Sequence, residues 1–357
     1  MPSPDFWKDK TVLLTGHTGF KGAWLSVWLS MLGARVTGLS LGPLDGRSLY
    51  QTFGKKSVNE ECFVDIRDHE ALCRTVRRIR PEIILHLAAQ SLVRQSYAAP
   101  VETFATNVMG TVHLLDALRD ADFCRAIVVV TSDKCYENRE WVWPYRESDA
   151  MGGHDPYSAS KGAAELVAAS YRRSFFAARH TAVATARAGN VIGGGDWAKD
   201  RLVPDCLTAF ARGETVIVRA PNATRPWQHV LEPLSGYLLL SERLADTGQS
   251  YAEGWNFGPE MKSVWPVRAV VDHLVAAWGE AAAWRLDENA NPHEATLLAV
   301  DAAKAQSRLG WQPRLSVAEA LDWTVAFHRA LEAGSDDPGH SRKLCEKQIE
   351  DFTGIST

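Results

Sequence analysis

Several features of membrane and secreted proteins are missing from this 357-residue chain. No apolar run reaches the length of about 18 residues that a transmembrane helix needs. The N-terminal segment MPSPDFWKDK carries acids among its bases and lacks the apolar stretch of a secretory signal. These absences favour a cytoplasmic protein that does not engage membranes.

Patterns for metal and nucleic-acid binding are also missing. The six cysteines are scattered without a CxxC pair, and the eleven histidines include no HExxH motif. We therefore expect reduced thiols and no metal site. The net charge is −4 and no basic block is present, which argues against a nucleic-acid partner.

The composition is that of a globular protein. Hydrophobic residues make up 46% and charged residues 23% of the chain, which is enough apolar material for a large core. At roughly 150 residues per domain, the length predicts about two domains. Tryptophan is unusually frequent, with 13 residues against 8 tyrosines and 12 phenylalanines.

The first half of the chain alternates short apolar runs with longer amphipathic ones, which is typical of strands in a parallel sheet joined by helices. The predicted strands are Thr11–Thr15, Arg35–Leu41, Cys62–Asp65, Glu82–Ala89, Ala126–Ser132 and Thr181–Val191. The predicted helices between them include His69–Arg80, Val101–Arg119 and Pro156–Ala177. This order predicts an α/β fold with a doubly wound parallel sheet.

Beyond about Gly193 the pattern loosens into loops rich in Gly, Pro and Trp, among them WNFGPEMKS. Further helices are predicted at Val230–Ala245, Val267–Trp278, Asp301–Leu309, Val317–Leu331 and around Ser341–Phe352. We expect a sheet domain from residues 1–192 and 228–258, and a smaller interleaved domain from 193–227 and 259–335. Residues 336–357 are expected to form a C-terminal tail.

A glycine-rich turn, Gly16-His-Thr-Gly19-Phe-Lys-Gly22, follows the first predicted strand and opens a helix. Residues without a Cβ let the backbone turn tightly and approach a pyrophosphate, and the helix N-terminus supplies N–H groups and positive potential. The spacing differs from the commonest dinucleotide fingerprint by one residue. A glycine-rich turn without a ligand is the alternative.

The ends of the next strands offer weaker signals. Ser40 stands where an acid usually binds the ribose hydroxyls, so the sequence does not decide between NAD and NADP. Asp65 and Ile66 are placed to flank an adenine, or Asp65 caps a helix or loop. Ala88 and Ala89 are small enough for backbone to approach a cofactor, or for close helix packing.

Tyr157 and Lys161 are expected on one face of a helix, because residues i and i+4 are neighbours there. Asp155 is a good N-cap and Pro156 a good first residue for this helix. An ammonium beside the phenol would favour the phenolate of Tyr157, whose ordinary pKa is about 10. A phenolate can then act as a base toward a sugar hydroxyl.

Longer segments extend these motifs over nearly the whole chain. They are TGHTGFKG (15–22), HLAAQ (86–90), TNVMGT (106–111), TSDKCY (131–136), DPYSASKG (155–162), RAGNVIGGGDWAKDRLVPD (187–205), RPWQHVLEPLSGY (225–237), WNFGP (255–259) and PHEA (292–295). With them the chain resembles the nucleotide-sugar 4,6-dehydratases of the extended short-chain dehydrogenase/reductase family. The similarity is strongest to the branch that acts on CDP-glucose.

The resemblance implies a Rossmann-type fold and a tightly held NAD that is reduced and reoxidised in each turnover. Tyr157, with Lys161 and Ser132, would oxidise the sugar at C4. Water would then be lost across C5 and C6, and the hydride would return to C6. The implied product is CDP-4-keto-6-deoxyglucose, a precursor for deoxysugars and O-antigens.

The elimination pair departs from related enzymes that act on dTDP-glucose and GDP-mannose, in which an Asp-Glu or similar pair follows the Ser or Thr. Here Asp133 and Lys134 stand at these positions. Asp133 as an acid needs a raised pKa, and Lys134 as a base needs a lowered one. Our hypothesis is Asp133 as acid and Lys134 as base. The alternative is a charged Lys134 that stabilises an enolate while Asp133 shuttles protons.

The resemblance and the motifs together give the expected ligand-binding residues. The predicted NAD-binding residues are Gly16, Thr18, Gly19, Phe20, Lys21, Gly22, Ser40, Asp65, Ile66, Leu87, Ala88, Ala89, Asn107, Tyr157 and Lys161. The predicted substrate-binding residues are Gln90, Asn190, Arg201, Leu202, Val203, Arg219, Arg225, His229, Asn256 and His293. The arginines match phosphate oxygens, with surface salt bridges as the alternative, and His293 alternatively lies on the surface.

Other functions stay open on the sequence alone. They are a dehydratase for another nucleotide sugar, a 4-epimerase without the elimination pair, and a non-catalytic NAD-sensing regulator. The resemblance also implies a homodimer or homotetramer that packs through the helices 101–119 and 156–177, unless the alanines of the second helix face the sheet. Five tryptophans are expected to wall the site: Trp141, Trp143, Trp197, Trp227 and Trp255. Trp24 and Trp28 are expected in the core.

Overall fold

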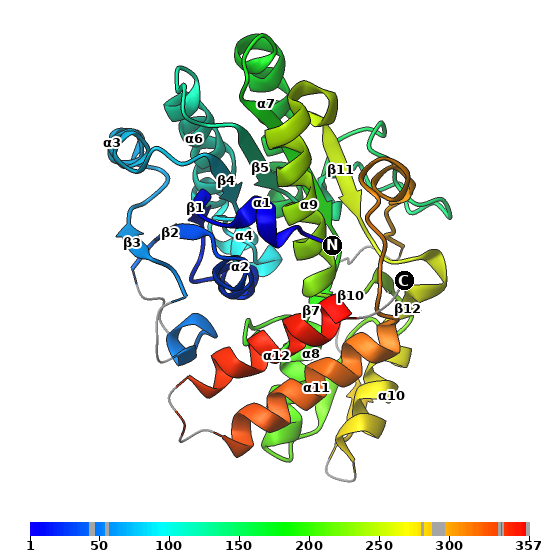
Figure 1. Cartoon of the computed structure of the whole chain (residues 1–357). Coiled ribbons are helices and arrows are strands. Elements are labelled where there is room, and N and C mark those ends of the chain that lie inside the picture. Colours follow the sequence, from blue (N-terminus) through cyan, green and yellow to red (C-terminus); the bar gives the residue numbers. More distant parts are fainter. Residues whose placement is uncertain are drawn as a thin grey trace.

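The computed structural model describes residues 1–42, 47–53, 57–279, 282–287, 297–334, 337 and 339–354 (Figure 1). Seven parallel strands form the central sheet, in the order β11-β6-β5-β4-β1-β2-β3. They are β1 (Thr11–Thr15), β2 (Arg35–Ser40), β3 (Glu60–Phe63), β4 (Ile83–His86), β5 (Ala126–Val130), β6 (Ala182–Ala188) and β11 (Gly254–Phe257). The doubly wound parallel sheet is therefore confirmed.

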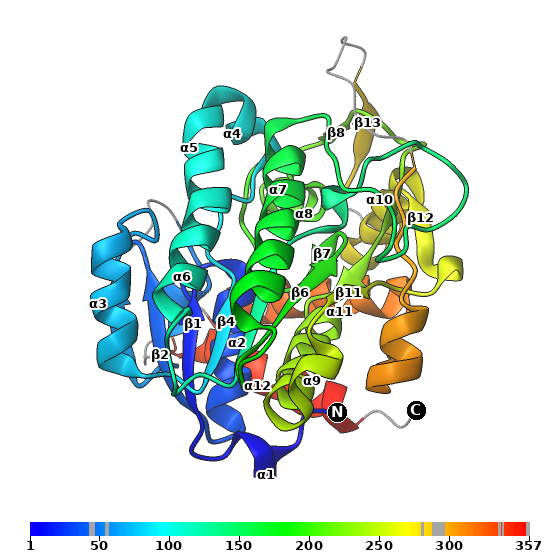
Figure 2. The ribbon, with the colours of Figure 1, turned by 90° about the horizontal axis from the view of Figure 1, so that it is seen from above.

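Helices cover both faces of this sheet, as expected for parallel strands. One face carries α3 (His69–Ile79), α6 (Gly110–Leu118) and α7 (Pro156–Tyr171), which lie side by side in Figure 2. The other carries α2 (Phe20–Met31) and α9 (Leu231–Thr247). Because alternate residues of a strand point to opposite faces, Leu13 packs with the first layer and Leu14 with the second.

A smaller unit with its own apolar core lies beyond the carboxyl ends of the strands. Its helices are α8 (Leu202–Ala211), α10 (Val267–Trp278) and α11 (Val317–Ala333). Its strand pairs are β7 (Val191–Ile192) with β10 (Gln228–His229), β8 (Val216–Val218) with β13 (Trp284–Leu286), and β9 (Thr224–Pro226) with β12 (Val264–Pro266). The chain crosses between the two units repeatedly after β6.

The remaining short elements complete the described chain. They are α1 (Pro4–Trp7), α4 (Val93–Ala98), α5 (Pro100–Phe104), α12 (His340–Gly354), the 3-10 segments η1 (Tyr50–Phe53), η3 (Asp133–Cys135), η5 (Gly248–Tyr251) and η6 (Met261–Ser263), and the π-helical segments η2 (Ala105–Met109), η4 (Arg172–Phe176) and η7 (Ala305–Leu309). The predicted helices 101–119 and 156–177 thus each contain a π-helical segment, and 301–309 is mostly one.

Two expectations about the strands are wrong. The segment WNFGPEMKS was expected to be loop, but Gly254–Phe257 form β11 at the sheet edge, paired with β6. Residues 181–191 were expected to form one strand, but β6 ends at Ala188 and β7 starts at Val191. The chain leaves the sheet at Gly189 and Asn190, which both line the cavity described below.

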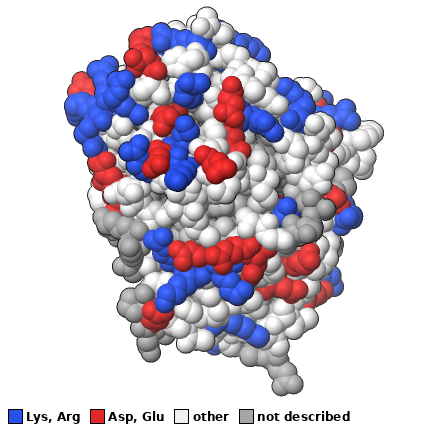
Figure 3. All heavy atoms as spheres, viewed as in Figure 1, with Lys and Arg blue, Asp and Glu red and all other residues white. Residues whose placement is uncertain are grey.

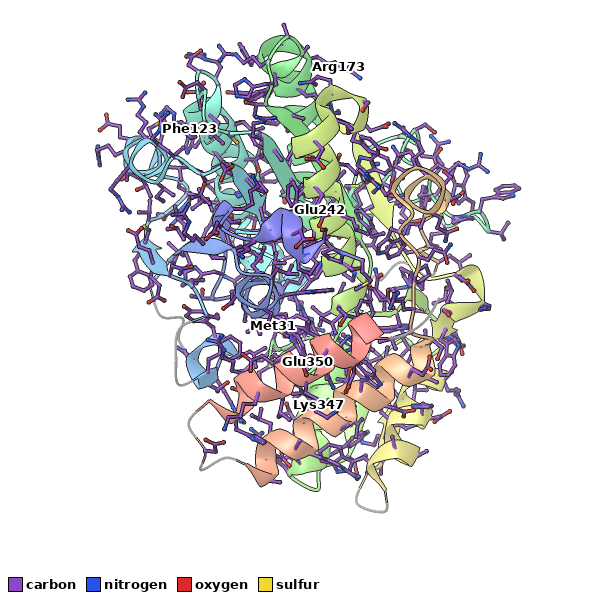
Figure 4. The ribbon with its side chains drawn as sticks, in the orientation of Figure 1. Met31, Phe123, Arg173, Glu242, Lys347 and Glu350 are labelled. Atoms are coloured by element: carbon purple, nitrogen blue, oxygen red, sulfur yellow. The ribbon has the colours of Figure 1, made fainter. Side chains whose placement is uncertain are left out.

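The C-terminal segment is not a detached tail. Helix α12 packs against α2 and η1, where Cys345, Ile349 and Phe352 are buried and Phe352 meets the Trp28 ring edge-on. The other end is also anchored, because Trp7 Nε1 donates to Glu242 Oε1 at 2.7 Å. Glu242 lies on α9 and is labelled in Figure 4. Trp24 and Trp28 are buried in the core, which confirms the prediction for them.

The surface agrees with the composition. On the face in Figure 3, basic and acidic side chains lie next to one another. Among the described residues, none of the helices combines the length and apolarity required to cross a bilayer.

Candidate active site

A cavity of about 1560 Å³ lies beyond the carboxyl ends of the central strands. One end reaches the turn after β1 and the ends of β2 and β3, and the other reaches α8 and β8. Between these ends it passes the residues that follow β5 and the first turns of α7. The strand order reverses between β1 and β4, which is where open α/β sheets bind ligands.

The glycine-rich turn forms one wall of this cavity and leaves no room for larger residues. Gly16 has a φ of +73°, and a Cβ there would lie 2.8 Å from the backbone nitrogen of Ala88. A Cβ on Gly22 would lie 2.1 Å from the carbonyl oxygen of Gly16. Helix α2 starts at Phe20 without a side-chain cap, so its first N–H groups can bind phosphate oxygens. This cradle fits a dinucleotide pyrophosphate.

The neighbouring strand ends complete this half of the cavity. Thr15 Oγ1 accepts hydrogen bonds from the backbone nitrogens of Leu87 and Ala88, each at 3.1 Å, and thereby ties the end of β4 to β1. Asp65 lines the cavity and forms an ion pair with Arg67 at 2.6 Å. Ser40 lines it too, and its hydroxyl donates to the carbonyl of Leu41.

Ser132, Tyr157 and Lys161 all line this cavity, and all three are at least nine-tenths buried. Asp155 caps α7 by accepting a hydrogen bond from the Ser158 backbone nitrogen at 2.9 Å. Lys161 Nζ donates to the carbonyl of Val130 at 3.2 Å, which places the ammonium at the end of β5.

Burial dominates the electrostatics of this group. It raises the pKa of Tyr157 to about 12, although the hydrogen bond with Ser132 acts in the opposite direction. Burial also lowers the pKa of Lys161 to about 8, against the attraction of Glu165. The overall direction of the Tyr157 pKa is therefore upward, opposite to the lowering expected from the sequence, because loss of hydration is the largest cause.

Asp133 and Lys134 line the same stretch of the cavity. Ser132 Oγ donates to Asp133 Oδ1 at 3.0 Å, and Oδ2 is buried without a hydrogen-bond partner in the described part of the chain. Burial raises the pKa of Asp133, while Lys134 lowers it. A buried carboxyl with one open oxygen and a raised pKa suits a proton donor.

The opposite end of the cavity is rich in arginine. Arg201 Nη1 pairs with Asp196 Oδ2 at 2.9 Å, and Nη2 reaches Ser91 Oγ at 3.3 Å across the opening. Arg219 and Arg225 line the wall made by β8 and β9. Asn190, Leu202 and Val203 complete the predicted substrate-binding residues that line this half.

Two predicted ligand-binding residues, Asn107 and Gln90, brace a loop instead of lining the cavity. Asn107 Oδ1 accepts a hydrogen bond from the Gln90 backbone nitrogen at 2.8 Å, and Asn107 Nδ2 donates to Ser160 Oγ at 2.8 Å. The Gln90 side chain donates to Thr103 Oγ1 at 2.9 Å. The side-chain amides of Asn107 and Gln90 are therefore engaged in hydrogen bonds within the protein.

His229 and Asn256 also lie away from the cavity lining. His229 is completely buried between the rings of Trp24 and Trp323. Asn256 is equally buried in β11, where Oδ1 accepts from the Tyr136 hydroxyl at 2.7 Å. His293 lies outside the described residues.

The tryptophan prediction is mostly wrong. Of the five proposed wall residues, Trp227 alone lines the cavity. Trp255 is fully buried in the sheet core, and Trp143 is exposed. Trp141 stacks on Tyr145, and Trp197 packs on His328. Their motifs lie near the site in sequence, but the side chains serve as packing or surface.

Some residues of the site were missed. Tyr136, Asn138 and Arg139 line the cavity from the loop after η3, which carries no periodic signal. Glu165 lies behind the site and binds Arg187. Its position four residues after Lys161 is a helical spacing that could have indicated it.

The sequence model of a family described as GDP-mannose 4,6 dehydratase matches residues 13–324. A protein of Salmonella typhimurium named CDP-glucose 4,6-dehydratase is 48% identical over the whole of both chains. A dTDP-glucose 4,6-dehydratase of Xanthomonas campestris is 25% identical, covering 88% of this chain and 92% of the relative.

Solved structures show the same fold. DesIV, a dTDP-glucose 4,6-dehydratase from Streptomyces venezuelae with NAD and TYD bound, has a TM-score of 0.76 at 26% identity, covering 88% of this chain and 96% of its own. A UDP-glucose 4-epimerase from Stenotrophomonas maltophila has a TM-score of 0.79 at 22% identity, covering 91% and 99%. The latter likeness concerns the fold alone.

The geometry of the turn predicts the effect of filling it. In Gly16→Ala, the added methyl group meets Ala88 and the residue must keep a positive φ, so dinucleotide affinity should fall at least about tenfold. Quenching of tryptophan fluorescence on titration with NAD measures this. Gly42→Ala is the matched control, because no atom of the described residues lies within 4 Å of a Cβ there. Equal affinities for Gly16→Ala and the control would contradict the assignment of the turn.

Proposed function

The chain belongs to the GDP-mannose 4,6-dehydratase family, and from this we propose that it converts CDP-glucose to CDP-4-keto-6-deoxyglucose. It is an NAD-dependent nucleotide-sugar dehydratase of the extended short-chain dehydrogenase/reductase type. The observation that carries the choice of CDP-glucose is the 48% identity over the full length of the Salmonella enzyme.

The residues of the central cavity support the dehydration chemistry. Tyr157 is placed to take the proton of the C4 hydroxyl, with Ser132 as its hydrogen-bond partner. Once C4 is a ketone, the C5 proton becomes acidic. Asp133 is then the donor to the departing C6 hydroxyl, because its buried carboxyl has a raised pKa and one open oxygen. Lys134, beside it, is our candidate for the base at C5.

NAD fits the half of the cavity built by Gly16, Gly22 and the uncapped start of α2. When bound, it supplies the oxidising and reducing equivalents for C4 and C6. Backbone N–H groups at the start of α2 would hold its pyrophosphate, and the small cavity-lining residues Ala88 and Ala89 would let it approach the backbone closely. We propose that Arg201, Arg219 and Arg225 bind the substrate diphosphate.

The substrate assignment is tested by incubating the purified protein with CDP-, dTDP-, GDP- and UDP-glucose and with GDP-mannose. We expect only the CDP sugar to lose the mass of one water and to give the alkali-induced near-ultraviolet absorbance of a 4-keto-6-deoxy sugar. An isomerised hexose of unchanged mass would instead identify a 4-epimerase. Water loss from another nucleotide sugar would retain the dehydratase and reject CDP-glucose.

Tyr157→Phe removes the phenol oxygen without altering the shape of the site. We expect turnover to fall by about 10²- to 10⁴-fold, because the positioned proton acceptor is lost, while NAD affinity stays within twofold of wild type. Steady-state kinetics and fluorescence titration measure the two effects. Turnover at the wild-type rate would refute the role of Tyr157.

Lys134→Ala separates the two readings of the elimination pair. If Lys134 is the base, oxidation at C4 persists in this variant but exchange of the C5 proton with deuterated water slows by about 10²-fold or more. Mass spectrometry of recovered substrate and product measures the exchange. Unchanged exchange would eliminate the base role and leave Lys134 as an electrostatic partner of the enolate.

We also propose a homodimer formed through the layer of α5, η2, α7 and η4 (Figure 2). Large apolar side chains are exposed along this layer, which is unusual for a surface facing water. They are Val101, Phe104, Met109, Leu166 and Phe175. Ala164 and Ala168 face inward and are buried, so the alternative reading of the alanines holds for these two.

The six described free cysteines fit a reducing compartment, which supports placing the enzyme in the cytoplasm.

Leu166→Glu tests the dimer. A charge in an apolar interface should convert the protein to monomers in sedimentation velocity at micromolar concentration. Leu286→Glu, at an exposed position on β13, is the matched control and should keep the wild-type state. A Leu166→Glu protein that sediments with the wild type would place the interface elsewhere.

A further inference from the structure

Glu165 is a buried carboxylate behind Ser132, Tyr157 and Lys161, and each of its two oxygens accepts two hydrogen bonds. Glu165 Oε1 accepts from Thr131 Oγ1 at 2.5 Å and from Arg187 Nε at 2.9 Å. Oε2 accepts from Thr185 Oγ1 at 2.7 Å and from Arg187 Nη2 at 2.7 Å. The Glu165 and Arg187 side chains are each 5% exposed. Glu165 itself does not line the cavity, so it does not touch substrate or cofactor.

The four bonds join three elements that carry the reaction. Thr131 comes from the end of β5 and directly precedes Ser132. Thr185 and Arg187 come from β6, and Glu165 lies on α7. Arg187 Nη1 also donates to the Tyr136 hydroxyl at 2.6 Å, which ties the loop after η3 to the same group. A shift of α7 relative to β5 would therefore break these bonds together.

Glu165 lies one helical turn after Lys161, on the same face of α7. Its negative charge is the largest attraction acting on the Lys161 ammonium. The other titratable groups that act on Lys161 come from neighbouring elements and are Cys135 of η3, His86 of β4 and Lys21 of α2. Of these, Lys21 opposes the charged form of Lys161.

Stabilisation of the fold alone does not explain the buried ion pair of Glu165 and Arg187. Burying two charges costs free energy, and well-packed apolar residues often replace such a pair without loss of stability. The charge on Glu165, however, has a second neighbour in Lys161, which is buried and loses hydration in the same region. An apolar pair would leave that ammonium without its carboxylate.

We propose that Glu165 is a positioning residue of the dehydratase: with Arg187 it fixes Thr131 and Ser132 against α7, and it holds its carboxylate one helical turn from Lys161. This inference deepens the proposed function. Its first test, however, reads the charge of Lys161 directly and does not require any substrate to turn over.

That test measures the rate of Lys161 carbamylation by cyanate as a function of pH, by peptide mass spectrometry on the unliganded protein. In Glu165→Gln we expect the Lys161 pKa to fall by about one unit, because the nearby opposite charge is lost. The double variant Glu165→Gln with Arg187→Met also removes the unpaired guanidinium. Its Lys161 pKa should therefore lie between those of Glu165→Gln and the wild type. Equal Lys161 pKa values in all three proteins would overturn the proposal.

The positioning of Ser132 is tested by two isosteric variants that keep both charges and the fold. Thr131→Val and Thr185→Val each remove one hydroxyl donor to Glu165, at the end of β5 and within β6. We expect kcat with CDP-glucose to fall about tenfold in Thr131→Val with KM unchanged, and by less than half that factor in Thr185→Val. Equal effects, or an effect on KM alone, would show a structural role only. An inactive wild type would refute the substrate assignment while leaving the carbamylation result intact.

Discussion

The ion pair between Glu165 and Arg187 is the interaction on which the geometry of the cavity depends most. It joins β6 to α7, the helix that carries Tyr157 and Lys161, and Glu165 also accepts a hydrogen bond from Thr131, which lies between the end of β5 and Ser132. Parallel strands end at one edge of the sheet, so their last residues can converge on a ligand. The hydrogen bonds around this ion pair bring the segment that carries Ser132 together with the helix that carries Tyr157 and Lys161.

Burial is the force that sets the chemistry of these side chains. It raises the pKa of Tyr157 and of Asp133 and lowers that of Lys161, because each charged form loses hydration. Neighbouring charges act against these shifts. Glu165 raises the pKa of Lys161, and Lys134 lowers the pKa of Asp133.

The sequence predicts the parts of the fold that follow from local pattern. Buried apolar runs gave six strands of the sheet, and Asp155 with Pro156 gave the start of α7. It did not predict β11, because a four-residue edge strand between Gly254 and Phe257 has no periodicity to distinguish it from a loop. Nor did it predict the packing of α12, since contacts between residues about 300 positions apart, such as Thr52 with Ser341, leave no local signal.

The candidate site likewise contains residues whose position follows from local sequence and residues whose position depends on tertiary packing. Glycines and the Tyr157–Lys161 spacing are local constraints, and they lie where expected. The directions of His229, Asn256 and Trp255 depend on which side of a strand or helix faces the core, and these three point into the protein. Membership of a motif places a residue near a site along the chain, but not its side chain inside the cavity.

The central claim is that one cavity oxidises C4 of a CDP sugar and reduces C6 of the same molecule. CDP-glucose carrying deuterium at C4 tests it most directly, with the product examined by NMR and mass spectrometry. We expect the deuterium to appear at C6 of the 4-keto-6-deoxy product within the same molecule, without net consumption of NAD. Loss of the deuterium from the product, or its return to C4 of a hexose, would contradict it.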